Sequence, residues 1–430
     1  MDSERVAVPF RGAGGGEGPL TWGQREIWQT MRRTGRTLNV GGTIPVPATA
    51  TATVEQYESL LSYVVSRHEA LRTRFALDAA GDPVRQVVDA AGTVHLDVAE
   101  GHTDADAEAL RRHYEFTPFD LAREYPVRMG VVARAGRPSH LVVQYSHLAV
   151  DGFGIDAIVR DLVHRDAADP PPVSGLRPLE LAAQQGSPAG QRQSAKALRH
   201  WKGLLAGVPV ARLAGSDDPR TPRFREYTFR SPALHLALGA VAARTRAETG
   251  HVLLAAYAVA LERVTGLRPV VVQVLVSNRF RPGCADAVCH LTQPGLVVID
   301  PSPPFDDLVA RVWRSATAAY LHGYYDPSGH AEMLASLGGP VDLSCFVNDR
   351  RAPAPRPGAV PGAAAVRSLL PRTTGRWERE LPAYDGSLYV QADTEGDAVQ
   401  LGIWADTHAI APADVERFSL ALQDAAVTAV

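Results

Sequence analysis

Ser-His-Leu-Ala-Val-Asp-Gly, at residues 146–152, is the stretch from which the fold can be worked out. Apolar residues dominate positions 140–146 and predict a strand that runs straight into this stretch. Two glycines then break the strand, and residues 155–163 have the spacing of a helix. His147 and Asp151 are therefore predicted to lie on a strand-to-helix turn, where side chains can face a cleft.

The residue types in this turn are suited to acid–base chemistry. A neutral imidazole at His147 can accept a proton from an attacking amine or hydroxyl. Asp151 can hold the turn by pairing with a cation or with backbone N–H groups, and Gly152 permits backbone conformations that other residues resist. The pattern alone leaves a catalytic histidine and an ordinary surface or core histidine both open.

A serine beside a histidine raises the alternative of a serine nucleophile. Adjacent residues of a strand point to opposite faces, so Ser146 is not expected to reach the His147 ring. The Gly-x-Ser-x-Gly elbow of serine hydrolases is also missing at this position. We therefore do not predict a catalytic triad.

Asp151 needs a partner, and the dipeptide Asn278-Arg279 offers one. It follows an apolar run at 269–276, which predicts a buried strand. An arginine at a strand end is well placed for a bidentate pair with a carboxylate. A surface arginine is the alternative, and the residues alone do not decide between the two.

Strand and helix patterns alternate along the whole chain, which indicates an α/β fold. A length of 430 residues suits two domains, and a Pro-, Ala- and Gln-rich stretch at 166–190 is the predicted crossing between them. The glycine-rich residues 12–18 lack the ending of a phosphate-binding loop and are interpreted as a flexible connection. Helices are predicted at 20–31, 54–75, 195–205, 251–264, 305–321 and 413–427, and strands at 127–135, 341–347, 387–391 and 399–404.

Composition excludes several classes of protein. A net charge of -3 gives no general attraction to nucleic acid or to an anionic membrane. The three cysteines are too few and too irregularly spaced for a disulfide scaffold or a zinc site. No apolar run reaches the roughly 18 residues of a membrane helix, and the N-terminus lacks the pattern of a signal peptide. We expect a cytoplasmic protein that binds no metal and no membrane.

Four motifs in order resemble those of the condensation domain family of nonribosomal peptide synthetases, which is related to chloramphenicol acetyltransferase. Residues 20–28 (LTWGQREIW) resemble the family's opening helix, and 67–75 (RHEALRTRF) closely match its second motif. Residues 146–152 resemble its His-His-x-x-x-Asp-Gly signature, and 278–279 its Asn-Arg segment. The resemblance covers the chain from about residue 20 onward.

This resemblance implies a V-shaped pair of chloramphenicol acetyltransferase-like lobes with a central tunnel. Residues 1–170 would form the N-terminal lobe and residues 171–430 the C-terminal lobe. His147 and Gly152 are the expected catalytic positions, with Gly152 beside the reacting thioester. The residues expected to support the site are Asp151, Arg279, Ser146 and Arg72, and those expected in the tunnel are Asn348 and Gln293.

The sequence departs from the family pattern in two places. Ser146 replaces the first histidine of the signature, although related acyltransferases keep only the second. Residues 288–294 (VCHLTQP) stand where the family has a Gly-x-x-Val-Asn-Thr type of segment. This second departure bears on the tunnel wall and on the substrate.

The predicted function is that of a free-standing condensation enzyme in specialised metabolite biosynthesis. It would transfer an acyl or aminoacyl group from the phosphopantetheine of an acyl or peptidyl carrier protein to an amine or alcohol, which is a small molecule or is itself carrier-bound. A thioester is already activated, so we expect no bound cofactor, and a monomer supplies both lobes. The alternative, motivated by Ser146, is an inactive condensation-like platform that recruits a carrier protein or a tailoring enzyme.

Overall fold

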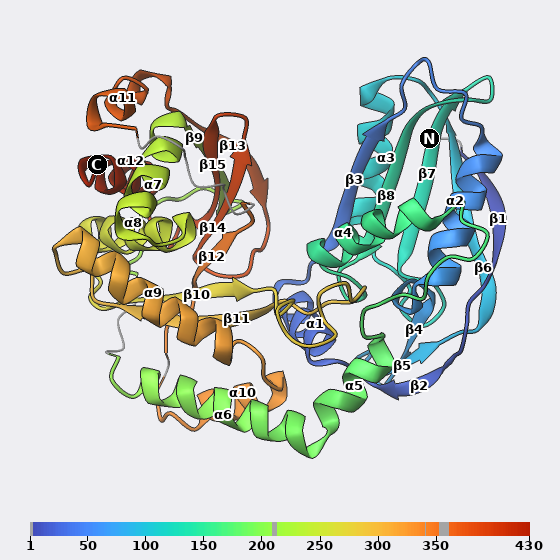
Figure 1. Cartoon of the computed structure of the whole chain (residues 1–430), viewed down its shortest axis with the longest axis horizontal. Coiled ribbons are helices and arrows are strands. Elements are labelled where there is room, and N and C mark those ends of the chain that lie inside the picture. Colours follow the sequence, from blue (N-terminus) through green and yellow to red (C-terminus); the bar gives the residue numbers. More distant parts are fainter. Residues whose placement is uncertain (1–2, 209–212, 340, 352–360) are drawn as a thin grey trace. The chain divides into compact units, whose positions relative to one another are not determined.

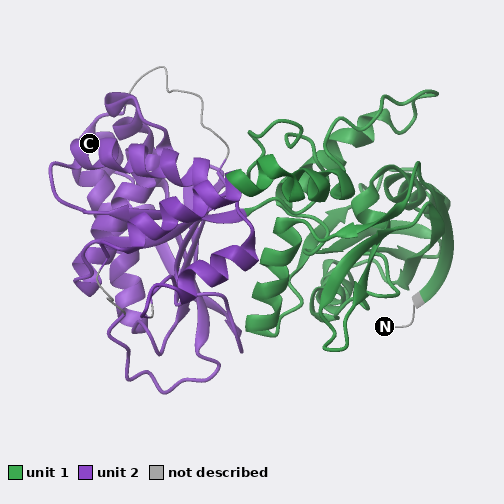
Figure 2. Cartoon of the chain, turned by 90° about the horizontal axis from the view of Figure 1, so that it is seen from below, with its two compact units in different colours: residues 1–192, 277–292 green, residues 193–276, 293–430 purple. Residues whose placement is uncertain are grey.

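The computed structural model describes residues 3–208, 213–339, 341–351 and 361–430. The chain forms two compact units, which Figure 2 shows in different colours. Unit 1 comprises residues 1–192 and 277–292, and unit 2 comprises residues 193–276 and 293–430. The division differs from the expected boundary at 170/171, because residues 171–192 and 277–292 both belong to unit 1.

Side-chain hydrogen bonds explain why residues 171–192 belong to unit 1. The backbone N–H of Trp22 donates to the side chain of Gln185 at 2.8 Å, and the Gln86 amide donates to the carbonyl of Pro178 at 3.2 Å. These bonds satisfy buried polar groups inside unit 1, so the segment behaves as part of its fold and not as a linker.

Unit 1 is built on a five-stranded sheet of order β1-β6-β7-β8-β3 and a three-stranded sheet of order β2-β5-β4 (Figure 1). Its strands are β1 Ser3–Arg11, β2 Gly16–Pro19, β3 Asn39–Pro45, β4 Thr73–Leu77, β5 Pro83–Val88, β6 Ala91–Glu100, β7 Val127–Arg134 and β8 Arg137–Ser146. Its helices are α1 Trp22–Thr34, α2 Val54–Arg67, α3 Asp104–Phe116, α4 Gly152–Asp161 and α5 Pro178–Gly186.

The alternation of strand β8 places its two faces in different parts of the core. Leu141, Val143 and Tyr145 join the larger cluster with side chains of α2 and α4, whereas Val142 joins a smaller cluster with α3. Because the side-chain period of a strand is two, Ser146 continues the Val142 face. Strand β8 is antiparallel to both of its neighbours, β7 and β3.

Unit 2 contains one seven-stranded sheet of order β11-β10-β12-β14-β15-β9-β13. Its strands are β9 Phe224–Ser231, β10 Val270–Val276, β11 Gln293–Ile299, β12 Cys345–Asp349, β13 Thr374–Leu381, β14 Leu388–Glu395 and β15 Ala398–Asp406. Its helices are α7 Pro232–Thr245, α8 Thr249–Thr265, α9 Phe305–His322, α10 Pro327–Ala335, α11 Ala363–Arg367 and α12 Pro412–Thr428, and α6 Pro188–Leu205 begins in unit 1 and continues here. Side chains from α7, α8, α9 and α12 pack with one face of the sheet in the main core.

Two predicted segments differ from the structure. The predicted helix 54–75 ends at Arg67, where His68 takes an extended conformation, and residues 73–77 form strand β4. The glycine-rich stretch 12–18, predicted as a flexible connection, leads into β2, and the buried guanidinium of Arg72 donates to the carbonyls of Ala13 and Gly14. Apolar spacing continues past the true helix end, which is why the pattern extended the helix too far.

Candidate functional site

The turn between β8 and α4 is fixed by short-range hydrogen bonds. The N–H of Ala149 donates to the carbonyl of Ser146 at 3.0 Å. Asp151 is the N-cap of α4, and its Oδ1 accepts from the N–H of Gly154 at 2.8 Å. A capping aspartate satisfies an N–H group that the first helical turn leaves without an intrahelical partner. The sequence therefore specifies where the strand stops and the helix starts.

The ring of His147 is held in one tautomer. Its Nδ1–H donates to the carbonyl of Val150 at 2.8 Å, so the lone pair belongs to Nε2. Nε2 has no hydrogen-bond partner among the described residues. Burial lowers the pKa of His147 below its usual value, although the Val150 carbonyl and Asp151 oppose the shift. The side chain is a neutral base at pH 7.

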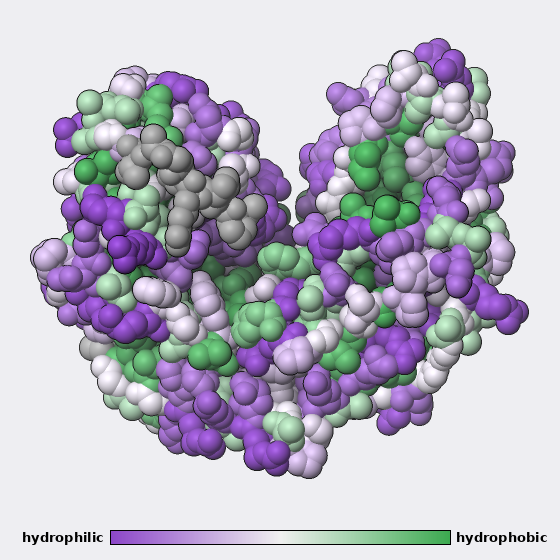
Figure 3. Space-filling model, viewed as in Figure 1, coloured by the Kyte–Doolittle hydropathy of each residue, from purple (hydrophilic) through white to green (hydrophobic). Residues whose placement is uncertain are grey.

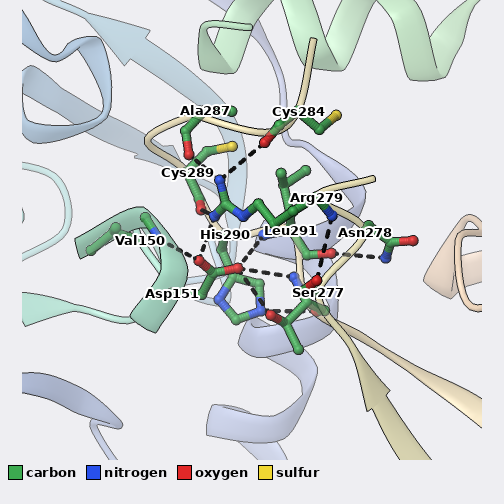
Figure 4. Close-up of polar contacts among 12 residues, drawn as sticks. Val150, Asp151, Ser277, Asn278, Arg279, Cys284, Ala287, Cys289, His290 and Leu291 are labelled. Carbon is green, nitrogen blue, oxygen red and sulfur yellow. Dashed lines mark hydrogen bonds and ion pairs between the residues drawn. The ribbon is translucent and has the colours of Figure 1, made fainter. Parts of the chain in front are cut away.

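Asp151 is the centre of a buried network that Figure 4 shows. Its Oδ1 also accepts from Nη2 of Arg279 at 2.5 Å. Its Oδ2 accepts from the N–H groups of Leu291 and Thr292, at 3.0 and 3.2 Å, and from the Thr292 hydroxyl at 3.0 Å. The structure thus brings together Asp151 and Arg279, a pairing that the residues alone left open.

Arg279 closes residues 277–292 into a compact segment. Its guanidinium donates to the carbonyls of Cys284, Ala287 and Cys289 in addition to Asp151. Burial alone would raise the pKa of Asp151, but the charge of Arg279 holds that pKa below its usual value. Asp151 and Arg279 form a buried ion pair in which both carboxylate oxygens accept hydrogen bonds.

Ser146 and Gly152 lie on either side of this turn. Ser146 is 1% exposed, and its hydroxyl has no hydrogen-bond partner within the described residues, so the structure does not join it to His147. Gly152 is exposed at the start of α4, and a Cβ built on it would meet no atom within 4 Å. The backbone at Gly152 is therefore open to a ligand, whereas Ser146 is enclosed.

The motif at 67–75 supports unit 1 at other points. Arg72 is buried and donates to the carbonyls of Ala13, Gly14 and Asp89, and none of its described contacts is with His147 or Asp151. Arg67 pairs with Asp161, the last residue of helix α4. The arginines of this motif thus fix the glycine-rich segment and the far end of the helix that Asp151 caps.

Gln293 and Asn348, the expected tunnel residues, are both in unit 2. The Gln293 side chain is buried, and its amide donates to the carbonyl of Tyr325 at 2.9 Å. The Asn348 amide lies 3.3 Å from the hydroxyl of Tyr389 and is partly exposed. Of the two, Asn348 has the more accessible polar group, and Gln293 serves the backbone of its own unit.

His290 is the site residue that sequence reasoning missed. Its ring contacts that of His147, with centroids 4.7 Å apart and planes at 77°. Thr292, which binds Asp151, was not singled out either. Both residues lie in 288–294, the stretch that departs from the family pattern, so the departure itself was the available signal.

Comparisons with known proteins identify the family and the fold. Residues 17–328 match the model of the Condensation domain family. A probable non-canonical nonribosomal peptide synthetase, CymA of Salinispora arenicola, is 31% identical over 327 aligned residues, and the match covers 71% of this chain but only 4% of CymA. The chain therefore spans a small part of the length of this curated relative.

Two solved structures show the same fold. The condensation domain of the monacolin K polyketide synthase MokA matches with a TM-score of 0.75 at 16% identity, over 96% of this chain and 97% of that one. The X-domain in its complex with OxyB from teicoplanin biosynthesis matches with a TM-score of 0.71 at 22% identity, over 95% and 92%. The predicted α/β, chloramphenicol acetyltransferase-like class is confirmed.

The family model covers most of the chain, and the fold is shared over nearly all of it. None of the helices in the described ranges combines the length and the apolarity that a membrane crossing requires. This chain belongs to the condensation domain family.

Proposed function

We propose that the chain transfers an acyl or aminoacyl group from a carrier-protein thioester to an amine or alcohol, with His147 as the base or positioning group. The observation that carries this proposal is the bond from His147 Nδ1–H to the Val150 carbonyl. It leaves Nε2 as an acceptor, and the lowered pKa keeps the ring neutral. A general base needs both properties.

In the proposed reaction, Nε2 accepts a proton from the attacking N–H or O–H group. The nucleophile adds to the thioester carbonyl, the new C–N or C–O bond forms, the C–S bond breaks, and the imidazolium returns its proton to the phosphopantetheine sulfur. General-base help of this kind contributes about 10²–10⁴-fold. Holding the two reactants together contributes more, up to about 7–11 kcal/mol of the barrier.

The N-terminus of helix α4 can stabilise the negative charge that develops in this reaction. The N-terminus of a helix carries a partial positive charge, and its first N–H groups can donate to a developing oxyanion. Gly152 stands at that position without a side chain, and its surroundings are open. In this proposal the thioester carbonyl approaches the backbone of Gly152, and Asp151 and Arg279 support the turn structurally.

Exposed apolar side chains on unit 1 support the proposal that a protein partner binds there. Val159 on α4 and Val163 just after it are 59% and 78% exposed. Figure 3 shows hydrophobic residues gathered over this helix. Exposed apolar side chains next to a candidate site are typical of interaction surfaces, and a carrier protein bearing phosphopantetheine is the partner that the reaction requires.

A platform without catalytic activity is the second candidate. The observation that favours it is Ser146, which replaces the first histidine of the signature and whose hydroxyl has no hydrogen-bond partner within the described residues. The similarity to an X-domain that forms a complex with OxyB also favours recruitment of another enzyme. Against it stand the fixed tautomer and lowered pKa of His147, which a platform does not need.

Intact-mass spectrometry of acyl transfer distinguishes the two candidates. An acyl-loaded cognate carrier protein is mixed with candidate amines and alcohols, and product is followed for the wild type and His147→Ala. The proposal predicts product from the wild type and a loss of about a hundredfold or more in the variant. Equal rates would remove His147 from the mechanism, and no product from either protein, together with tight binding of a carrier or enzyme, would favour the platform.

A further inference from the structure

His290 was not assigned any role by the family pattern, yet it is the side chain in ring contact with His147. The ring centroids are 4.7 Å apart and the planes are nearly perpendicular, which is the edge-to-face arrangement that aromatic rings prefer. A second imidazole therefore meets the candidate base from the segment 277–292, whereas position 146, where the family has one, holds a serine.

Hydrogen bonds of the residues before and after His290 in the sequence fix its position. The carbonyl of Cys289 accepts from Arg279, and the N–H of Leu291 donates to Asp151. Helix α1 closes a third side, because a Cβ built on Gly23 would lie 2.0 Å from the His290 carbonyl oxygen and 3.0 Å from its Cδ2. The Asp151–Arg279 pair thus sets where the His290 ring stands.

The His290 ring is also fixed in its protonation. Nε2 lies 3.1 Å from the Thr292 carbonyl, to which it donates as Nε2–H. Nδ1 is buried without a hydrogen-bond partner within the described residues, and the residue is 3% exposed. Burial, with some repulsion from His147, lowers the pKa of His290 to about 3, so the ring is neutral at working pH. With a pKa this low and almost no exposure to solvent, the His290 ring is suited to packing and not to proton transfer.

The hydrogen bond to the Val150 carbonyl restrains the His147 ring at Nδ1. The ring of His290 adds a contact at another point of the imidazole and covers part of it from water. We propose that His290 is a positioning residue, which holds the His147 ring by edge-to-face contact so that Nε2 keeps one direction and the ring stays desolvated. This inference rests on the proposed function of His147.

Two substitutions test whether the ring itself matters. His290→Phe keeps an aromatic ring and loses the bond to Thr292, whereas His290→Asn loses the ring as well, because its shorter amide does not reach the place of Nε2. We expect His290→Phe to retain kcat within about threefold and His290→Asn to lose about 10–100-fold in kcat with little change in KM, since misplacing a catalytic group by about 1 Å can cost 10²-fold.

The titration of the His147 ring, followed by NMR of histidine-labelled protein and assigned with His147→Gln, gives a readout that needs no turnover. The titratable groups that act on this ring are Asp151 and His290, and the charge of Arg279 acts on both of them. Loss of the ring in His290→Asn admits water, so the pKa of His147 should rise toward its usual 6.5, and His290→Phe should leave it low. The acid limb of kcat/KM should move with it.

His330→Asn is the control, because His330 is a histidine of unit 2 whose ring packs against Trp201 and Tyr325 and whose pKa burial lowers to about 4. It should leave the His147 titration unchanged. A His290→Asn protein with the wild-type titration and kcat would overturn the proposal, and so would loss of activity in His290→Phe with retention in His290→Asn. If the wild type transfers no acyl group, the NMR titration still decides the contact, and only the proposed function fails.

Discussion

The turn at 146–152 and the segment at 277–292 meet at one ion pair but are held in place differently. The turn is fixed by neighbours in sequence, such as the bonds from Ala149 to Ser146 and from His147 to Val150. The segment is fixed to Asp151 by bonds that span 128 to 141 positions. The ring of the candidate base, His147, is therefore held by its sequence neighbours, whereas its surroundings depend on a long-range pair.

The strongest way to break this comparison is Arg279→Ala. The change leaves the Asp151 carboxylate buried without its cation, which costs about 3–5 kcal/mol of the free energy of unfolding. Denaturant unfolding measures this loss, and hydrogen exchange should show residues 277–292 released first. Arg350→Ala is the matched control, because its pair with Asp393 is exposed and worth at most about 1 kcal/mol. Equal losses for the two variants would contradict the account.

Two glycines of helix α4 separate stability from chemistry. A Cβ at Gly154 would lie 2.5 Å from Val150 Cγ2 and 3.2 Å from the Cys289 carbonyl oxygen, where the turn meets the segment. Gly154→Ala should therefore cost about 1–3 kcal/mol in stability. Gly152→Ala meets no atom within 4 Å and should keep its stability but slow acyl transfer, because the methyl group occupies the open side. Thermal unfolding and transfer rates of both variants test this, and the reverse pattern would exclude the assigned role of Gly152.

The pH dependence of stability should come more from the segment 277–292, through His290, than from the turn 146–152. The pKa of His290 is about 3 in the folded state and near 6.5 when unfolded, so the unfolded chain binds more protons between these values. Stability is full above pH 6.5 and falls by up to about 1.4 kcal/mol per pH unit below it. His290→Phe should flatten this loss between pH 6.5 and 4.5 in denaturant titrations. An unchanged slope would show that His290 is not buried as a neutral ring.

Ser146→Ala should have the smallest effect. Its buried hydroxyl has no described partner, so replacement by a methyl group is close to neutral for stability. We expect the transfer rate to stay within about threefold, whereas loss of a true serine nucleophile can cost on the order of 10⁶. Steady-state rates on a cognate carrier decide this, and a rate below detection would restore the serine mechanism.

Local signals made the turn predictable from the sequence. Apolar alternation in β8, the capping Asp151 and the glycines after it specify strand, turn and helix without help from the rest of the chain. The residues alone left open whether Arg279 pairs with a carboxylate or lies at the surface, and the family resemblance placed it among the residues that support the site. The α/β class followed from the alternation of patterns along both halves.

The other features of the site and the fold depend on tertiary contacts that no local sequence pattern predicts. Arg279 binds three carbonyls of its own segment, and Leu291 and Thr292 donate to Asp151; these bonds bring His290 and Thr292 to the site. The domain boundary at 170/171 differs from the observed units because Gln185 satisfies the backbone of Trp22. Residues 73–77 form a strand although their apolar spacing continued the helix before them. Tertiary hydrogen bonds decide each of these cases.

The central claim is that His147 acts through Nε2, and single-turnover acyl transfer with His147→Gln tests it most directly. Glutamine is close in size but cannot take the proton. With a preloaded cognate carrier and a saturating acceptor, the account predicts a transfer rate lower by about a hundredfold or more, at an unchanged unfolding midpoint. A variant that transfers at the wild-type rate would contradict it.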